Sequence, residues 1–390
     1  MIQFPLRTAA LCLLLSTPAA MAQPAAMALP APPRLTIDGP AEVVFDPARH
    51  ACDGHDVPDV PPRAYRDAAG TVRMFALHHE NRALTGDSLD ALKLDCRVVF
   101  RGHHSADPAA YDDKSWIAAT WTDDGRRIHG LIHHEFQANT HKGRCTFSEY
   151  MACWYNSVLA IHSADGGLTF AKLPRPVVAS APFPQSVEQG RHRGFFNPSN
   201  IVTDGVWHYM FASTTGWTGQ DGGACLFRTD RIADPGRWRA YDGVGFETKF
   251  TDPYRETTDP AATCLTLAPF PAPVGSVTRH TPSGQWIAVF QAKADGKRFA
   301  VSGIYAAASR DLKLWSAPSL ILATKTLYDD ACGAGTLMSY PTLIDRASPS
   351  RNFDTTGSTA DLYLSQMRVE GCKHTSDRKL VRMRVAIGVK

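Results

Sequence analysis

Beyond its first residues, the 390-residue sequence has no apolar run of the about 20 residues that a membrane-spanning helix requires. It also has no basic tract and no acidic tail, and its formal net charge is only +3. Nucleic acids and anionic membrane surfaces attract proteins through dense positive charge, so neither is an expected partner. The sequence contains no serine nucleophile elbow, no P-loop and no G-x-G-x-x-G motif after a strand. These absences argue against nucleotide-dependent and serine-hydrolase chemistry.

Helical patterning is also scarce. Few windows place apolar residues with the 3.6-residue period of an amphipathic helix, and 29 glycines and 27 prolines interrupt the chain. Short apolar stretches separated by turn residues are typical of β-strands instead. The sequence therefore predicts an all-β fold.

The N-terminus has the three parts of a signal peptide. Arg7 supplies the positive charge, Ala9–Leu15 the apolar segment, and Ala20-Met21-Ala22 the cleavage site. We therefore expect a secreted or periplasmic monomer, whose net charge falls from +3 to +2 when Arg7 is removed. The expected organisation is a signal peptide, a Pro- and Ala-rich linker and a single domain, at residues 1–22, 23–34 and 35–390.

Nine cysteines are present, and Cys12 lies in the signal peptide. The remaining eight are an even number in an exported chain, which predicts disulfides. No C-x-x-C motif occurs, so a cysteine zinc site is not expected. Eight cysteines allow 105 pairings. The pairing with the shortest loops is Cys52–Cys96, Cys145–Cys153, Cys225–Cys264 and Cys332–Cys372.

One unit recurs along the chain: a short strand, a turn that contains Gly or Asp, and an apolar strand that ends in polar residues. In its clearest copy, two apolar strands flank the turn Asp123-Asp124-Gly125, and the second strand ends in His133, His134 and Glu135. The copies start far enough apart to leave room for four strands in each unit. They are found at residues 63–81, 115–137, 199–214, 276–293 and 339–368.

These units predict a five-bladed β-propeller, in which Ala41–Phe45 adds an outer strand to the last blade and closes the ring. The stretch 163–170 fits S-x-D-x-G-x-T-F, the Asp-box pattern of sialidases and related propellers. This pattern is a signal of fold, since it lies on the rim, away from the channel. A six-bladed, sialidase-like ring and a two-sheet sandwich remain alternatives.

In a propeller, residues before the first strand and at the end of the second strand of each blade meet at one mouth of the channel. Aligning the units brings carboxylates, imidazoles, amides and guanidinium groups to this mouth, as a sugar-binding funnel requires. Trp217, in a Gly-rich loop, is the expected sugar platform. The side chains expected to bind substrate are Arg63, His79, His134, Asn197, Asn200, Trp217, Tyr340 and Arg368.

Glycosidic cleavage uses two carboxyl groups, one protonated and one ionised. Asp59 and Glu135 come from adjacent units and form the predicted catalytic pair. Glu135, behind apolar strand residues, is expected to have a raised pKa and to act as the acid. Asp59, near Arg63, is expected to stay ionised as base or nucleophile, and Asp113 is a third carboxylate that could tune the acid.

Doubled histidines at positions 78/79, 103/104 and 133/134 raise the question of a metal. Adjacent residues of a strand point to opposite faces, so a doublet offers at most one ligand to the channel. His79 and His133 with a carboxylate would form a site for a structural divalent cation. We expect no cofactor and no metal from the sequence. A structural divalent cation in the channel remains the alternative.

Three stretches resemble the five-bladed glycoside hydrolases of the arabinanase, β-xylosidase and invertase-like superfamily. They are FFNPSNIVTDGVWHYMF (195–211), which is similar to a blade start, PDVPPRAYRD (58–67) and SRDLKLW (309–315). The resemblance implies a five-bladed propeller that cleaves a carbohydrate.

That resemblance also implies an Asp from the first blade, an Asp from the second and a Glu acid from the third. Asp59 matches the first by position and Asp113 the second. The third blade carries Asn197 at the expected place, so Glu135 of the second blade is the substitute.

A second resemblance, to sialidases, rests on the Asp box, Arg63 and Tyr340. It implies a Tyr nucleophile and three arginines on a substrate carboxylate, for which Arg63, Arg193 and Arg368 are the candidates. The function predicted from the sequence is a secreted glycoside hydrolase acting on a polysaccharide or oligosaccharide. The alternatives are a noncatalytic propeller that binds glycans or a protein, and a sialidase-like enzyme for acidic sugars.

Overall fold

The computed structural model describes residues 1–2 and 29–388. The expected signal peptide, with Cys12, and the first part of the expected linker lie outside the described residues. Within them, the helices are single turns: α1 (Pro47–His50), η1 (Pro108–Ala110), η2 (Ala138–Thr140) and η3 (Pro235–Arg237). Nearly all other regular structure is β-strand, which confirms the all-β prediction. None of the described helices is long and apolar enough to cross a membrane.

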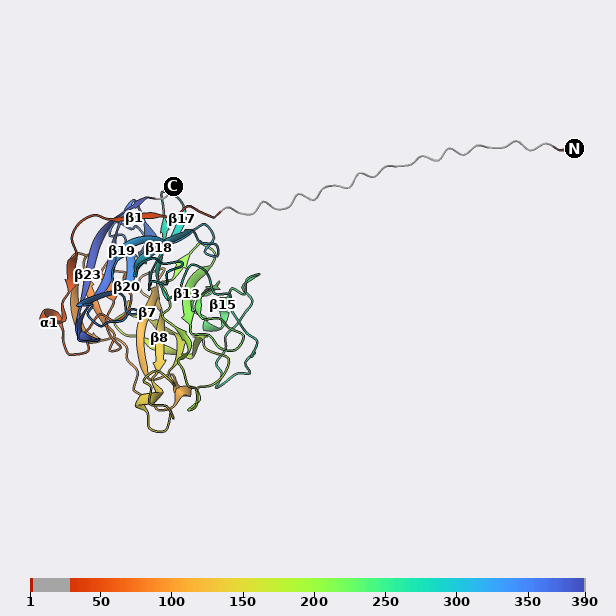
Figure 1. The fold of residues 1–390 in the computed structure, drawn as a ribbon, viewed down its shortest axis with the longest axis horizontal. Coiled ribbons are helices and arrows are strands. Elements are labelled where there is room, and N and C mark those ends of the chain that lie inside the picture. The colour runs from red at the N-terminus through yellow and green to blue at the C-terminus, as the bar shows by residue number, and fades with distance from the viewer. Residues whose placement is uncertain (3–28, 389–390) are drawn as a thin grey trace.

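Each predicted unit folds as an antiparallel meander of strands that follow one another in the chain (Figure 1). Group 1 consists of β3 (Arg63–Arg66), β4 (Val72–Phe75), β5 (Arg82–Gly86) and β6 (Lys93–Val98). Group 2 consists of β7 (Lys114–Trp121), β8 (Ile128–Phe136), β9 (Tyr155–Ser163) and β10 (Ala171–Ala179). Group 3 consists of β11 (Arg193–Phe196), β12 (Val202–Thr203), β13 (His208–Thr214), β14 (Gly223–Thr229) and β15 (Arg239–Ala240).

The last two groups contain the C-terminal part of the chain. Group 4 consists of β16 (Val274–His280), β17 (Gln285–Ala292), β18 (Gly303–Ser309) and β19 (Ser319–Ala323), and the short β21 (Thr355–Thr356) pairs with β16. Group 5 consists of β20 (Thr336–Ile344), β22 (Thr359–Glu370) and β23 (Lys373–Gly388).

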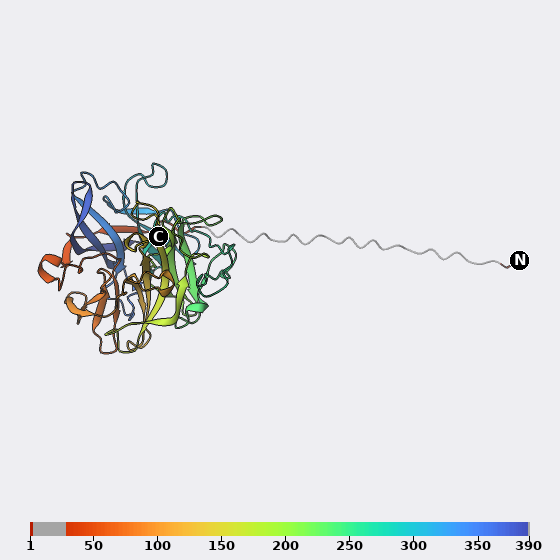
Figure 2. The same ribbon diagram turned by 90° about the horizontal axis from the view of Figure 1, so that it is seen from below.

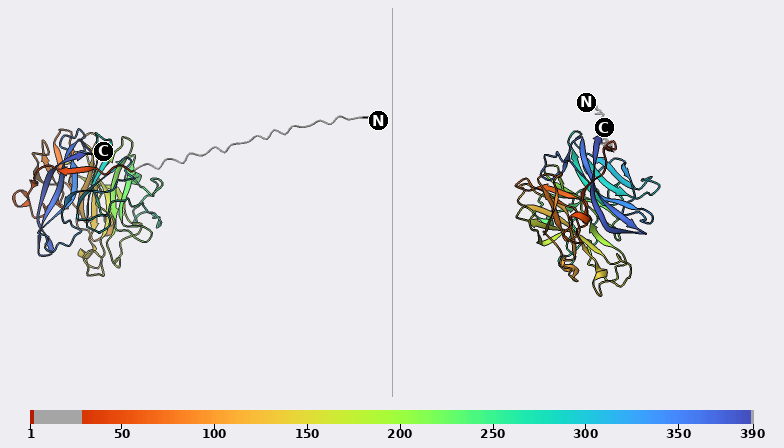
Figure 3. Two further views of the ribbon diagram at one scale, coloured as in Figure 1. Left: turned by 45° about the horizontal axis from the view of Figure 1, so that its top comes forward. Right: turned by 90° about the vertical axis from the view of Figure 1, so that its left-hand side faces the viewer.

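Group 5 is completed by the N-terminal end of the chain. Strands β1 (Arg34–Ile37) and β2 (Glu42–Phe45) both pair antiparallel with β23. In Figure 3 the red N-terminal strand runs beside the blue C-terminal strands. The predicted closure of the last unit by Ala41–Phe45 is therefore confirmed.

Successive side chains of the central strands point to opposite faces of the sheet, and both faces are buried. In β17, which is buried along its whole length, Trp286 and Phe290 pack on the side of group 3, whereas Ile287 and Val289 pack on the side of group 5. Because both faces are covered, the strand is a continuous apolar run. An apolar cluster of this kind lies between each pair of neighbouring groups.

Side-chain amides of two asparagines also join neighbouring groups, through hydrogen bonds to the backbone. The Asn81 amide bonds the backbone of Ser115 and Ile117 between groups 1 and 2, at 2.7 Å in both bonds. The Asn200 amide makes the same kind of reciprocal pair with Val277 between groups 3 and 4, at 2.8 Å. The predicted substrate-binding amide of Asn200 is therefore engaged inside the fold.

The remaining neighbours are joined in other ways. β11 pairs with β9, which merges groups 2 and 3 into one nine-stranded sheet. Leu343 N–H donates to Ser276 Oγ between groups 5 and 4, and Arg66 donates to two carbonyls of group 5. The groups thus form a closed ring, which is a β-propeller (Figure 2). Since two groups share one sheet, the count of five blades stays a prediction.

Arg63 occupies the centre of the ring. Its side chain is 2% exposed, and its guanidinium donates to carbonyls of Ala118 in group 2 and Pro198 in group 3 and to Thr342 Oγ1 in group 5. A cavity of about 20 Å³ beside it is also lined by Ser276 of group 4. The prediction that Arg63 binds substrate is wrong, because the side chain ties the groups together and has no access to the funnel.

All four predicted disulfides are present. They join Cys52 to Cys96, Cys145 to Cys153, Cys225 to Cys264 and Cys332 to Cys372. Each bridge stays within a group or its adjoining loops, as expected when strands that follow one another in the chain are also neighbours in space.

Candidate active site

Two acidic side chains, Asp59 and Glu135, come from the adjacent strand groups 1 and 2. Asp59 precedes β3, and its N–H donates to Ala76 O just after β4. Glu135 lies near the end of β8, opposite Lys114 at the start of β7. Burial raises the pKa of Asp59, and negative charge on Glu135 raises it further. The charge of one predicted carboxylate, Glu135, therefore acts on the other, Asp59.

Asp59 is flanked by a guanidinium and an imidazole. Its carboxylate pairs with Arg378 of β23, and its Oδ2 lies 3.4 Å from His78 Nε2. Burial dominates and raises the pKa of Asp59 to about 6, although the charge of Arg378 opposes this shift. The prediction that Arg63 keeps Asp59 ionised is wrong, because Arg63 points into the centre of the ring. The cation beside Asp59 comes from the opposite end of the chain.

Glu135 is held by two hydrogen-bond donors. Its Oε1 lies 2.8 Å from His133 Nε2, and its Oε2 lies 2.6 Å from Gln137 Nε2. Burial raises the pKa of Glu135, but these donors outweigh burial and leave the pKa lowered. The predicted raised pKa is therefore wrong. The sequence contained a signal for these donors, because His133 and Gln137 stand two residues before and after Glu135, and residues at this spacing lie on the same face of a strand.

The tautomer of His133 is set by the backbone. Its Nδ1 accepts the N–H of Asn197 at 2.8 Å, which favours the ring proton on Nε2, the nitrogen that lies 2.8 Å from Glu135 Oε1 and 3.0 Å from the Asn156 side-chain amide. Asn197 has a φ of 47°, a left-handed conformation that residues other than glycine adopt rarely. Such backbone strain is concentrated at functional sites. The contribution of Asn197 that the geometry shows is thus its backbone N–H.

Asp113 and His134 face away from the funnel. Asp113 is 1% exposed and accepts hydrogen bonds from His104, from His141 and from the backbone N–H of Gln137, at 2.8–2.9 Å. Burial raises its pKa, but these donors lower it overall. His134 is also 1% exposed, and its Nε2 accepts the N–H of Asp113. A substrate cannot reach either side chain, and Asp113 connects to Glu135 through Gln137.

Tyr340 and His79 are the predicted binding residues that remain beside the carboxylates. Tyr340 lies at a bulge in β20 with a φ of 58°, and its N–H donates to Gln291 Oε1 at 2.9 Å. Burial raises the pKa of Tyr340, and the charge of Asp59 raises it further. His79 packs its ring against those of His78 and Trp116.

The three arginines proposed for a sialidase-like site have separate partners. Arg63 is buried in the ring centre, as described above. Arg193 donates to Gly216 O at 3.3 Å. Arg368 is exposed, and its ion pairs are with Glu370 and Asp377 on its own hairpin. This arrangement does not bring three guanidinium groups onto one substrate carboxylate.

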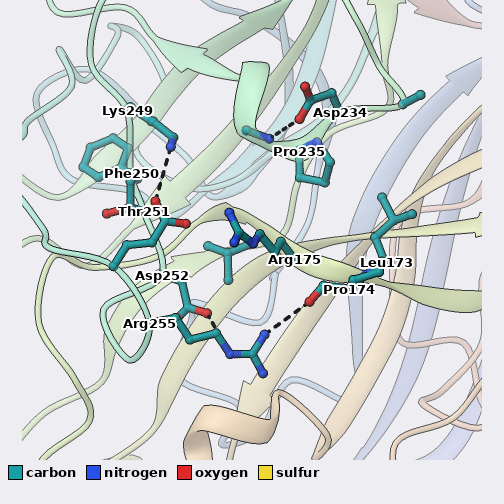
Figure 4. Close-up of a pocket in the computed structure, with 14 residues that line it drawn as sticks. Leu173, Pro174, Arg175, Asp234, Pro235, Lys249, Phe250, Thr251, Asp252 and Arg255 are labelled. Atoms are coloured by element: carbon teal, nitrogen blue, oxygen red, sulfur yellow. Dashed lines mark hydrogen bonds and ion pairs between the residues drawn. The ribbon is translucent and has the colours of Figure 1, made fainter.

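Two hollows in the surface lie apart from the carboxylate pair. Trp217 is 8% exposed and lines a hollow of about 580 Å³ with Phe183 and Arg193. A hollow of about 650 Å³ lies between β10 and η3, where Arg255 donates to Pro174 O and other charged side chains pair with one another (Figure 4). No residue predicted for the site lines this second hollow.

The comparisons with known proteins found similarity only at the level of structure. No protein-family model and no curated protein matches the sequence. The structure is similar to the catalytic domain of a GH62 α-L-arabinofuranosidase from Coprinopsis cinerea, with 10% identity over 92% of this chain and 98% of that chain and a TM-score of 0.47. It is also similar to an α-L-arabinanase from Cellvibrio cellulosa, with 11% identity over 86% of this chain and 96% of that chain and a TM-score of 0.45.

A third similar structure is the α-L-arabinofuranosidase PaAbf62A from Podospora anserina, with 10% identity over 92% of this chain and 98% of that chain and a TM-score of 0.46. These are enzymes of the kind named by the sequence resemblance. With TM-scores below 0.5, the matches carry no conclusion about what this chain acts on.

Proposed function

We propose that the chain is a secreted glycoside hydrolase that acts on a polysaccharide or oligosaccharide through Asp59 and Glu135. One observation carries the proposal: Asp59 and Glu135 come from neighbouring strand groups, the charge of Glu135 raises the pKa of Asp59, and each carboxyl group is held by different partners. Hydrolysis of a glycosidic bond requires two carboxyl groups with separate roles.

Glu135 takes the role of the ionised carboxylate. Hydrogen bonds from His133 and Gln137 reach both of its oxygens and favour the charged form. In a retaining reaction, Glu135 would attack the anomeric carbon. In an inverting reaction, it would remove a proton from the attacking water.

Asp59 takes the role of the acid. It donates its proton to the glycosidic oxygen while the bond to the anomeric carbon breaks and the electron pair leaves with the oxygen. Arg378 then balances the negative charge that remains on Asp59. These roles are the reverse of those predicted from the sequence, because the donors around Glu135 were not foreseen.

Groups suited to sugar hydroxyls surround the pair. Burial lowers the pKa of His192 to about 4, although the charge of Glu135 opposes this, so the ring is neutral at ordinary pH. A neutral imidazole offers one donor and one acceptor, which is the combination that a hydroxyl group can match. The Tyr340 hydroxyl adds another such group.

Export is supported by the disulfides. Four bridges are formed in this chain, and bridges of this kind persist in oxidising compartments. Together with the expected signal peptide, they support a secreted or periplasmic location.

The test is release of reducing sugar from a panel of polysaccharides and aryl glycosides. We expect activity in the wild type and a loss of about 100-fold or more in both Glu135→Gln and Asp59→Asn, since general acid–base catalysis contributes about 10²–10⁴-fold. Glu247→Gln, at an exposed position that lines none of the described hollows, is the matched control and should keep full activity. Full activity in both site variants would reject this pair of residues while keeping the hydrolase function.

A noncatalytic glycan-binding propeller is the second candidate, and one observation favours it. Asn197 stands where the family resemblance implies a catalytic Glu, and its backbone N–H is used to hold His133. If no substrate of the panel is cleaved while glycans bind the wild type and binding weakens in Glu135→Gln, the binding function replaces the hydrolase.

A further inference from the structure

Three imidazoles gather beside the funnel: His55, His78 and His79. One ring nitrogen from each of them lies within 4.8 Å of the others. The ring centroids are 6.2 Å apart for His55 and His78, 5.5 Å for His55 and His79, and 4.3 Å for His78 and His79. The sequence expectation that a doublet offers one ligand is wrong here. β4 ends at Phe75, so both members of the doublet lie in a loop and lack the alternation of a strand.

His78 and His79 pack on Trp116 and lie near Asp59 and Glu80, at 3.4 Å and 4.0 Å, but these contacts do not involve His55. Within residues 29–388, no hydrogen bond joins the three imidazoles to one another. The Nδ1 atom of His78 is buried and has no hydrogen-bond partner. Other buried histidine nitrogens in the described residues also lack partners, but this one belongs to a cluster of three imidazoles, where a bound ion would satisfy it. The cluster is therefore incomplete as it stands.

A second cluster of metal-ligating type serves as a contrast. It consists of His104, Asp113 and His141. Here each imidazole has a nitrogen within 2.9 Å of an Asp113 oxygen, so the carboxylate satisfies both rings. The cluster needs no ion to account for its geometry, whereas the cluster of three imidazoles does.

The orientation of His78 is the one that metal-binding histidines adopt. Its Nε2 faces Asp59 Oδ2 at 3.4 Å, which favours the ring proton on Nε2 and leaves the lone pair on Nδ1. A ligating histidine commonly directs its other nitrogen to a carboxylate in this way. The orphaned Nδ1 is thus the nitrogen left to bind a cation.

The loop that carries His55 is braced rather than loose. The Cys52–Cys96 bridge anchors it, and Asp56 accepts the N–H groups of Cys52 and Asp53. Arg82 pairs with both Asp53 and Asp56, at 2.6 Å and 2.8 Å. Such bracing keeps His55 over the doublet and reduces the ordering that binding would require.

We propose that His55, His78 and His79 bind a divalent transition metal of the zinc type through three ring nitrogens. Zinc favours imidazole nitrogen and a tetrahedral site, whereas calcium and magnesium favour oxygen ligands. With three protein ligands, the fourth position is open to water or to an oxygen of a bound substrate. Because His78 contacts Asp59, the metal lies at the edge of the funnel. The proposal does not depend on hydrolase activity.

The test is calorimetric titration of the chelator-treated full-length protein with Zn²⁺, together with the visible spectrum of the Co²⁺ complex. We expect one ion per chain and the intense visible bands of tetrahedral Co²⁺. His55→Ala and His79→Ala should each weaken binding by at least about 10-fold, since even the loss of a residue that only orients a ligand costs about 10–100-fold. His104→Ala, from the contrasting cluster, should bind as the wild type does.

His55 is exposed, so His55→Ala should keep the fold, which its circular dichroism and unfolding temperature would verify. The proposal is overturned if the wild type binds no Zn²⁺, or if His55→Ala binds it as tightly as the wild type. Binding that is lost in His104→Ala but kept in His55→Ala would move the ion to the other cluster and equally overturn the proposal.

Discussion

The channel contains two arginines in contrasting surroundings. Arg63, at the centre, donates to neutral oxygens of three other strand groups and has no carboxylate partner among the described residues. Arg378, at the mouth, pairs with Asp59. Burial lowers the pKa of Arg63 to about 9, whereas Arg378 is partly open to solvent. One arginine thus connects the groups of the ring, and the other supplies charge at the candidate site.

The difference shows that residue type alone does not assign a role in this fold. A guanidinium bonded to carbonyls satisfies the inner strands, and its removal would leave those carbonyls without partners. A guanidinium paired with a carboxylate can be removed at lower cost, because the carboxyl group can take up a proton and become neutral. Substitution of Arg63 should therefore lower the free energy of unfolding, whereas substitution of Arg378 should lower catalytic activity.

The largest effect is expected from Arg63→Met. The change leaves the carbonyl groups of Ala118 and Pro198 and the hydroxyl of Thr342 without this donor in the ring centre. It should destabilise the protein by about 3 kcal/mol or more. Chemical denaturation would measure it, with the exposed Arg368→Met as the matched control of unchanged stability. Equal stability of the two variants would show that Arg63 does not hold the ring together.

The next effect is expected from Arg378→Met, and it should appear in activity. Without Arg378, the charge left on Asp59 after proton transfer loses its guanidinium partner, so kcat should fall by about 100-fold, as for the loss of one electrostatic stabiliser. The free energy of unfolding should change much less than in Arg63→Met. If Arg378→Met loses stability but keeps the kcat of the wild type, Arg378 stabilises the fold and does not act in catalysis.

A pH profile tests the second carboxylate at the mouth. Glu135 must be ionised to act. Burial raises its pKa, but the hydrogen bond from His133 helps to lower the pKa overall. In His133→Ala the pKa of Glu135 should rise, so the acidic limb of kcat/KM should move to higher pH. His133→Gln can restore a donor and should show a smaller shift. A limb that moves to lower pH would contradict this role of His133.

The smallest effect is expected at the two asparagine amides that join neighbouring groups. Asn200→Ala removes two hydrogen bonds to Val277 and should cost about 1–2 kcal/mol. Asn81→Ala removes the matching pair between groups 1 and 2 and should cost about the same. Thermal unfolding with activity assays would measure both. A large loss of activity in Asn200→Ala at normal stability would return Asn200 to the substrate-binding set.

Much of the fold was predictable because it is built from local pairings. The hairpins, the closure by β2 and the four disulfides all join segments whose patterns are visible in the sequence. The same logic predicted that Asp59 and Glu135 lie near each other, since strand order fixes where strand ends meet, and the charge of Glu135 does raise the pKa of Asp59. The number of blades is harder to establish, because the parallel pairing of β9 with β11 joins two units in one sheet.

The site chemistry was less predictable because it depends on which side chains meet across the ring. Nothing in the sequence links Asp59 to Arg378, which lies on the third strand of the last group. The choice of Arg63 as its partner followed from closeness in sequence and failed. The gathering of His55 with His78 and His79 was missed for a related reason, since it depends on two loops and not on strand alternation.

The pairing of β1 and β2 with β23 has a consequence for how the chain can mature. Residues 34–45 are synthesised more than 300 residues before their hydrogen-bonding partner, residues 373–388. The ring therefore cannot close while the chain is still emerging from the ribosome or from an export channel. Until β23 arrives, β22 presents an open strand edge and β1 and β2 have no strand partner, and open edges are the surfaces that chaperones protect and that aggregation exploits.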